Sequence, residues 1–346
     1  MTSPASRPQL KVGVRRPLVS FFARAFVRIG VLPILLVAGI LFFSLIADNF
    51  LTVDNLHSAL RQNSYIIIAV MAQFIVLLSG GFDLSVGAIL ALVSVTTAMS
   101  MSAVADGVSP AMAVAIGVLT GIAVGVGAGL VNGLGVAVLK INPFIMTLAS
   151  ASVFTGLALL LTSGVPVYGM PPEFSDWLGF STPLGIGIAI WAAVLVAIGL
   201  GVFLQYTKSG RHVYAVGSSP LAARLSGVSE THVLIITYVV AGGLVAIGSI
   251  LLTARIETGE SNIGTTLPLL TIAAAVIGGV SLRGGSGRVL GAVLGAVFIG
   301  LLVNGMNLAQ IPSFYQMIVT GVVLAVAVVA DRLRGRVAAA VYAGRV

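Results

Sequence analysis

Residues 111–139 read AMAVAIGVLTGIAVGVGAGLVNGLGVAVL, an unbroken stretch of 29 residues without a charged side chain. As a helix, about 20 apolar residues are enough to cross the hydrocarbon core of a bilayer. The whole chain has this character: 58% of its 346 residues are hydrophobic and 8% are charged, whereas about a quarter are charged in ordinary soluble domains. The composition excludes a soluble globular enzyme and predicts an all-α polytopic membrane protein.

Glycine recurs at every fourth position of the same stretch. The glycines concerned are Gly117, Gly121, Gly125, Gly129 and Gly133. Residues four apart lie on one face of a helix, and a ridge of small residues lets another helix approach closely in a membrane. We therefore predict a packing role for this ridge rather than a role in solute binding.

Apolar stretches recur along the chain, and together they predict about ten transmembrane helices. The predicted spans are 29–47, 64–79, 84–104, 111–139, 144–163, 184–206, 233–254, 265–280, 289–304 and 314–330. The first is too long for the apolar core of a signal peptide and is interpreted as a retained span. Glycine pairs at 80–81 and 278–279 interrupt two short segments, which are candidates for half-spans.

The basic residues are distributed asymmetrically between the predicted loops. Ten spans place both termini on one side, and a cytoplasmic N-terminus puts 16 of the 18 Lys and Arg residues inside, leaving Arg61 and Arg255 outside. This distribution satisfies the positive-inside rule. The prediction is a basic cytoplasmic segment 1–28, a transmembrane domain 29–331 with a cytoplasmic loop 207–231, and a cytoplasmic tail 332–346. We expect the chain to contact membrane lipid and to bind no nucleic acid.

Catalytic and metal-binding motifs are missing from the sequence. The chain has no cysteine and three histidines, and these histidines have neither the H-E-x-x-H pattern nor an i, i+4 pairing that would hold zinc. The nearest match to a phosphate-binding loop, 284-GGSGR-288, lacks the Lys and hydroxyl residue that a nucleotide needs. We predict no catalytic residue, no metal site and no cofactor for this chain.

Few polar side chains fall within the predicted spans. One interpretation of Asp83 is a polar residue at a helix break, beside a conduction path. The interpretation that we favour is an N-cap for the next span. Asn132 and Asn304, with Phe82, are candidates for lining the path of a neutral, hydroxyl-rich solute. Hydrogen bonding between helices is the more frequent use of such amides.

The loop 207–231 contains the signals of a short capped helix. Ser219 is a good N-cap, Pro220 suits the first helical position, and Gly227 suits a left-handed stop. The helix is about two turns long, too short to be stable alone, and its residues Leu221 and Leu225 share a face. We expect it to dock onto its own membrane domain or onto a cytoplasmic partner.

Four motifs carry a resemblance to a known family. They are 80-GGFDLSVG-87, 142-NPFIMTL-148, the loop 210–228, and 277-IGGVSLRGGSG-287, which runs on to Asn304 and Gly305. With these motifs the chain resembles, over about residues 30–332, the membrane-spanning permease of the ribose-type sugar ABC importers. It departs from many relatives in 266-TLPLLTI-272, where the family's acidic pair is missing, and at Phe82, which replaces a commoner aliphatic residue.

The resemblance implies partners and a location. It implies a homodimer or heterodimer of ten-span subunits in the bacterial inner membrane, a cytoplasmic ABC ATPase that binds the ATP, and an extracytoplasmic solute-binding protein. It also implies that the helix of the loop couples the ATPase to the pore. Leu221 and Leu225 are then expected to enter an apolar groove of the ATPase, with Arg224 at the rim.

The sequence therefore predicts a permease of an ATP-driven importer that moves a neutral sugar or sugar-like solute. The alternative is a stand-alone secondary transporter or channel for a small polar solute. A coupled secondary transporter usually needs buried carboxylates or an unwound polar site to carry its ion, and acids are scarce in the predicted spans. An intramembrane enzyme is disfavoured because no catalytic constellation is present.

Overall fold

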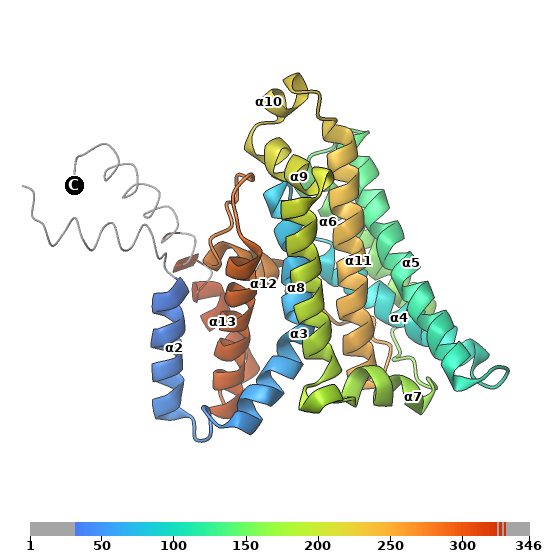
Figure 1. Cartoon of the computed structure of the whole chain (residues 1–346). Helices are drawn as coiled ribbons and strands as arrows, with labels where there is room; N and C mark the ends of the chain where they lie inside the picture. Colours follow the sequence, from blue (N-terminus) through green and yellow to red (C-terminus); the bar gives the residue numbers. More distant parts are fainter. Residues whose placement is uncertain (1–31, 324, 327–328, 330–346) are drawn as a thin grey trace, which may run out of the picture.

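The computed structural model describes residues 32–323, 325, 326 and 329 (Figure 1). Over these residues the secondary structure is helical, with one isolated bridge between Val167 and Gly259 and no named strand. The prediction of an all-α protein is confirmed. The predicted N-terminal segment 1–28 and the tail 332–346 lie outside the described residues.

Seven helices in the described part of the chain are long and apolar enough to cross a membrane. They are α3 (Val53–Leu78), α4 (Val86–Val104), α5 (Pro110–Ala137), α6 (Pro143–Thr162), α8 (Ile188–Tyr206), α11 (Glu230–Ile256) and α13 (Val289–Leu308). Three apolar helices are shorter: α2 (Leu32–Ile46), α12 (Leu267–Ile277) and Ser313–Val323. A polytopic membrane protein is thus confirmed, while the count of ten spans and the side on which the termini lie stay predictions.

Helix α3 begins eleven residues earlier than the sequence predicted, at Val53 instead of residue 64. The polar residues 54–63 hid this extension from a search for apolar stretches. The Thr52 side chain accepts a hydrogen bond from the Asn55 amide at 3.3 Å and so caps the helix. A capped first turn lets a polar segment continue the helix where it leaves the apolar core.

Short helices lie at the two ends of the bundle (Figure 1). Helix α7 (Pro172–Phe174), η1 (Ser175–Phe180) and η2 (Pro183–Gly185) join α6 to α8. At the opposite end, α9 (Lys208–Ser218) and α10 (Pro220–Leu225) join α8 to α11. We call these the α7 end and the α10 end.

The glycine ridge of α5 packs against two helices, as predicted. A Cβ atom on Gly129 would lie 2.2 Å from the Tyr238 carbonyl oxygen of α11, and one on Gly121 would lie 2.2 Å from the Thr97 hydroxyl of α4. Both distances are well inside van der Waals contact. Glycine is therefore what allows the backbone of α5 to come this close to its neighbours.

Helix α12 is short and apolar and belongs to the segment 265–280 that the sequence predicts as a candidate half-span. Its 11 residues rise about 16 Å, roughly half the thickness of the hydrocarbon core. The preceding segment 257–266 runs beside α4: the Glu260 amide donates to the Ser94 hydroxyl at 3.1 Å, and a Cβ on Gly87 would lie 2.0 Å from the Gly264 carbonyl oxygen. A segment of turns and irregular backbone thus brings the chain to the start of α12.

Candidate functional site

A break between α3 and α4 lies at the centre of the candidate site. Gly80 has φ +85°, a left-handed conformation that ends α3 and turns the chain. Two helices then hold the turn: the Tyr238 hydroxyl donates to the Phe82 carbonyl oxygen at 3.0 Å, and the Leu84 amide donates to the Thr147 hydroxyl at 3.0 Å. Groups from α11 and α6 therefore satisfy the backbone that the break leaves unpaired.

The carboxylate of Asp83 is buried in this turn, with 1% of the residue exposed. It accepts hydrogen bonds from the amide of Ser85, at 2.8 Å, and from the Ser85 hydroxyl. The N-cap of α4 is Ser85, so the prediction of Asp83 as N-cap was wrong by two residues. The physical role is close to the one favoured, because the carboxylate accepts an amide hydrogen beside the start of the span.

Asn132 joins the same cluster, and Asn304 does not. The fully buried Asn132 donates from Nδ2 to the Ser85 hydroxyl at 2.7 Å. Asn304 instead exchanges two hydrogen bonds with Asn55, at 3.0 and 3.1 Å, between α13 and α3. The structure thus brings Phe82, Asp83 and Asn132 together, and for Asn304 it shows the alternative use, an interhelical hydrogen bond.

A second glycine turn, 278–288, lies against the first. The Gly285 amide donates to the Leu78 carbonyl oxygen at 2.8 Å, and a Cβ on Gly284 would lie 2.8 Å from the Gly80 Cα atom. Helix α9 closes this contact: a Cβ on Gly217 would lie 1.9 Å from the Leu78 carbonyl oxygen. We call Gly80, Gly217, Gly284 and Gly285 the glycine contact.

Sequence reasoning missed α9, which it treated as part of a loop. The signal was present in Gly210, Val213 and Val216, which are spaced three apart and are all buried. Tyr214 fixes α9 further, since its hydroxyl donates to the Gly287 carbonyl oxygen at 3.1 Å. Burial raises the pKa of Tyr214 and the nearby charge of Arg288 opposes the rise, so this hydroxyl keeps its proton.

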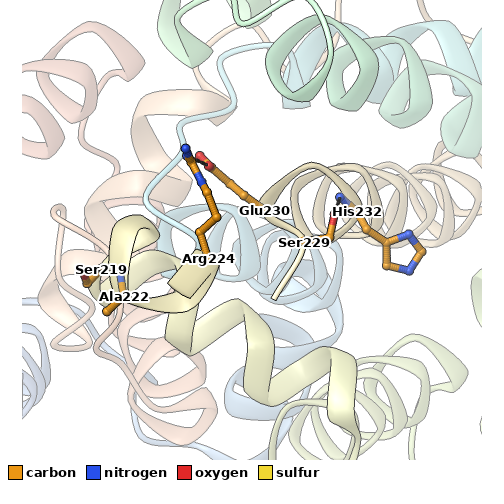
Figure 2. A network of polar contacts seen from close by, with 6 residues as sticks. All are labelled: Ser219, Ala222, Arg224, Ser229, Glu230 and His232. Carbon is orange, nitrogen blue, oxygen red and sulfur yellow. Dashed lines mark hydrogen bonds and ion pairs between the residues drawn. The ribbon is translucent and has the colours of Figure 1, made fainter. Parts of the chain in front are cut away.

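Helix α10 has the predicted caps. The Ser219 side chain accepts from the Ala222 amide at 3.2 Å (Figure 2). Pro220 is the first helical residue, and Gly227 follows the helix with φ +80°. The prediction of a short capped helix is confirmed. Local capping signals were sufficient because they act within a few residues of chain.

The leucines of α10 face away from the described part of the subunit. Leu221 is 66% and Leu225 is 82% exposed. Arg224 forms an ion pair with Glu230, the first residue of α11, at 2.6 Å, and the two side chains point toward each other in Figure 2. The ion pair holds α10 against the start of α11, which the Ser229 side chain caps by accepting from the His232 amide at 3.3 Å.

The described residues contain no group of three or more His, Cys, Asp or Glu side chains that could hold a metal ion. What they contain is a set of membrane-length helices, shorter apolar helices, two glycine turns in contact and a protruding capped helix. These features define a multi-pass membrane protein.

The chain belongs to the family described as branched-chain amino acid transport system / permease component, whose model matches residues 55–328. It is 36% identical to the ribose import permease protein RbsC of Escherichia coli (strain K12) over 314 residues, covering 90% of this chain and 96% of the relative. It is 40% identical to RbsC of Bacillus subtilis (strain 168) over 294 residues, covering 85% and 89%.

A third relative is the L-arabinose transport system permease protein AraH of Escherichia coli (strain K12), 37% identical over 325 residues, which cover 93% of this chain and 96% of the relative. No solved structure matches the chain. The resemblance to ribose-type sugar permeases is confirmed, and the chain is a transport subunit rather than an enzyme.

Proposed function

We propose that this chain is the membrane-spanning subunit of an ATP-driven ABC importer and that it moves a neutral sugar or sugar-like solute across the bacterial inner membrane. The observation that carries the proposal is its similarity, over about nine-tenths of the chain, to permeases named for ribose and L-arabinose import. Relatives of this chain are named for different sugars, namely ribose, D-allose and L-arabinose.

The absence of buried countercharges supports a neutral solute. Among the described residues, Asp83 is the only buried charged side chain, and its carboxylate already accepts two hydrogen bonds from Ser85. An ionic solute in a low-dielectric path would need a charge of opposite sign. A hydroxyl-rich solute needs only amide, hydroxyl and backbone groups.

The exposed leucines of α10 support docking of a separate ATPase. Leu221 and Leu225 are one turn apart and largely exposed, although α10 itself is held by its caps and by the Arg224 ion pair. A short, rigid helix with two apolar anchors suits helix-in-groove recognition. The rival idea, in which these leucines pack on their own subunit, has no support among the described residues.

The remaining partners follow from the family. We infer a second permease subunit, identical or homologous, an extracytoplasmic solute-binding protein, and ATP bound by the ATPase alone. We also infer that both termini are cytoplasmic, since 16 of 18 basic residues then lie inside. This orientation puts the α10 end in the cytoplasm, where the ATPase is.

Reconstitution tests the proposal. The permease, its ATPase and its binding protein are placed in proteoliposomes, and uptake of labelled D-ribose, L-arabinose and D-allose is measured with and without ATP. We expect uptake of at least one sugar only with ATP and all three components. Uptake driven by an ion gradient without the ATPase would establish the alternative, a secondary transporter.

A further inference from the structure

A pocket of about 450 Å³ lies at the α10 end of the described subunit. Its lining comes from five parts of the chain: the end of α3, the connection from α5 to α6, the end of α9 with the start of α10, the first turns of α11, and the glycine turn 278–288. Sites for small molecules in proteins usually have volumes of about 300–1,000 Å³. The pocket is therefore large enough to hold a small organic molecule.

The charged side chains of the lining leave an excess of positive charge. Lys140 and Arg283 are basic, and Glu230 is the acidic residue of the lining. Glu230 is already paired with Arg224, at 2.6 Å (Figure 2). This is the only ion pair among the described residues, so Lys140 and Arg283 have no carboxylate partner there. The pocket thus combines two cations that lack a counter-ion within the described part of the subunit.

The turn that carries Lys140 does not require a lysine. Lys140 has φ +58°, a left-handed backbone conformation that glycine and asparagine adopt more readily than other residues. On one side of the turn the Ile141 amide donates to the Gly135 carbonyl oxygen at 3.2 Å. On the other side the Asn142 side chain accepts from the Phe144 amide at 2.9 Å and caps α6. Other residues therefore hold the turn, and the lysine side chain is available to a ligand.

Neutral polar residues line the pocket beside the two cations. The Ser79 hydroxyl donates to the Val76 carbonyl oxygen at 2.8 Å, and the Ser218 hydroxyl donates to that of Gly285 at 3.4 Å. A hydroxyl that donates one hydrogen bond can still accept through its lone pairs. Asn142 uses its amide oxygen to cap α6 and keeps its two N–H donors. The lining therefore offers both donors and acceptors to a ligand with hydroxyl groups.

We propose that this pocket binds the phosphate group of a small hydroxyl-bearing molecule, with Lys140 and Arg283 as its cationic contacts. A phosphate monoester carries about 1.5 to 2 negative charges at neutral pH, which matches two cations without counter-ions. A guanidinium group binds phosphate through paired N–H donors, and a lysine binds it as a point charge. This ligand differs in charge from the neutral solute of the proposed function, so the inference goes beyond that function. Soluble phosphate esters and anionic lipid headgroups share this chemistry.

Binding of soluble phosphate compounds to the purified permease tests the site. The full chain is placed in nanodiscs of phosphatidylcholine, a lipid without net charge. Isothermal titration calorimetry is then performed with D-ribose 5-phosphate, glycerol 3-phosphate and inorganic phosphate, and D-ribose is the control without phosphate. We expect saturable binding of at least one phosphate compound and none of D-ribose. Equal binding of D-ribose would overturn the proposal, because the phosphate group would then contribute nothing.

Matched substitutions show whether the pocket is responsible for the binding. Lys140→Asn suits the left-handed turn, Arg283→Gln keeps a polar side chain, and each removes one charge. We expect each variant to bind at least about tenfold more weakly, as for a lost hydrogen bond to a charged group. Lys208→Asn and Arg211→Gln remove the same charges from α9, outside the lining, and should bind like the wild type. Equal losses in both pairs of variants would indicate general charge attraction and would overturn the site.

A lipid experiment identifies the source of the phosphate. The permease is released from nanodiscs that contain phosphatidylglycerol, and native mass spectrometry detects the lipid that it retains. Retention that is lost in Lys140→Asn and kept in Lys208→Asn would support the site with a lipid headgroup as its ligand. Binding of a soluble ester in phosphatidylcholine nanodiscs would support a soluble ligand. Failure of both experiments would overturn the proposal.

The ATPase is the competing partner for these two cations. If the wild type binds no phosphate compound, and Lys140→Asn and Arg283→Gln lose co-purification with the ATPase, the cations belong to ATPase docking and the proposal is overturned. These binding measurements use the permease without transport. A chain that imports none of the tested sugars would therefore contradict the proposed function and leave the test of the phosphate site intact.

Discussion

The hydroxyl of Tyr238 donates a 3.0 Å hydrogen bond to the carbonyl oxygen of Phe82, and this contact ties α11 to the break between α3 and α4. The partners are 156 residues apart in the chain. Gly81 also lies close to the Tyr238 hydroxyl, since a Cβ atom on Gly81 would be 2.8 Å from it. Tyr238 therefore holds the turn from α11, while Thr147 holds it from α6.

Tyr238→Phe should weaken this attachment. The substitution keeps the ring and leaves the Phe82 carbonyl oxygen with only the longer hydrogen bond from the Thr147 hydroxyl, at 3.4 Å. The loss of a hydrogen bond to a buried group costs about 1–3 kcal/mol. We expect a lower melting temperature in a detergent-solubilised thermal unfolding experiment. Tyr206→Phe, at a residue 75% exposed, is the control and should melt like the wild type; equal melting temperatures for both variants would contradict the role of the contact.

The glycine ridge makes a prediction that two glycines of the same helix can test. Gly129→Ala places a Cβ 2.2 Å from the Tyr238 carbonyl oxygen, whereas a Cβ at Gly127 meets nothing within 4 Å. We expect Gly129→Ala to cost about 1–3 kcal/mol of stability through overpacking, and Gly127→Ala to be neutral or stabilising. Size-exclusion chromatography after graded heating measures the stability of both variants. Similar losses of stability would mean that helix propensity, rather than packing, determines the effect of these substitutions.

Leu225→Asp should abolish docking of the ATPase. Burial of one leucine is worth about 1.5–3 kcal/mol, and the substitution also buries a charge in the groove. We expect a monodisperse permease that no longer co-purifies with the ATPase, while Arg224→Ala has a smaller effect because a rim charge contributes less.

Leu184→Asp is the matched control for this docking prediction, since Leu184 is 90% exposed and belongs to η2, at the α7 end. It should co-purify with the ATPase as the wild type does. Retained binding and solute-stimulated hydrolysis in Leu225→Asp would refute the coupling role, and an aggregated permease would favour packing of α10 on its own subunit.

Asn304→Ala should affect stability rather than transport. The variant removes both hydrogen bonds to Asn55, whose amide oxygen loses its donor while its amide nitrogen still donates to the Phe50 carbonyl oxygen. Hydrogen bonds between membrane helices contribute about 0.6–1.7 kcal/mol. We expect a lower melting temperature and an unchanged KM for sugar uptake at equal amounts of protein. A raised KM with an unchanged melting temperature would restore Asn304 to the solute path.

Thiol labelling of intact cells should settle the orientation. Single cysteines at Ser3 and Ala340 are expected to be protected from a membrane-impermeant reagent, and one at Leu184 is expected to react, because the positive-inside rule places the α7 end outside. Labelling at Ser3 or Ala340 without lysis would overturn the cytoplasmic termini.

Elements set by local sequence were predictable, and contacts between distant segments were not. The caps of α10 act over a few residues, so Ser219, Pro220 and Gly227 were sufficient to place it. The apolar helices follow from composition, because the membrane demands internal hydrogen bonding of the backbone.

The pairing of Asn304 with Asn55 joins residues 249 apart, and nothing in either neighbourhood specifies the other. Hydropathy placed the start of α12, at Leu267, within two residues of its predicted position. It does not record the course of 257–266 beside α4.

The glycine contact has a mechanical consequence. Where Gly217 meets Leu78 and Gly284 meets Gly80, main chain touches main chain with no side chain between them. Side chains absorb small movements by changing rotamer, and backbone atoms in direct contact have no such freedom. The glycine contact is therefore stiff, so a shift of α9 displaces both glycine turns together. Any residue larger than glycine at Gly217 would push the backbone segments of the glycine contact apart.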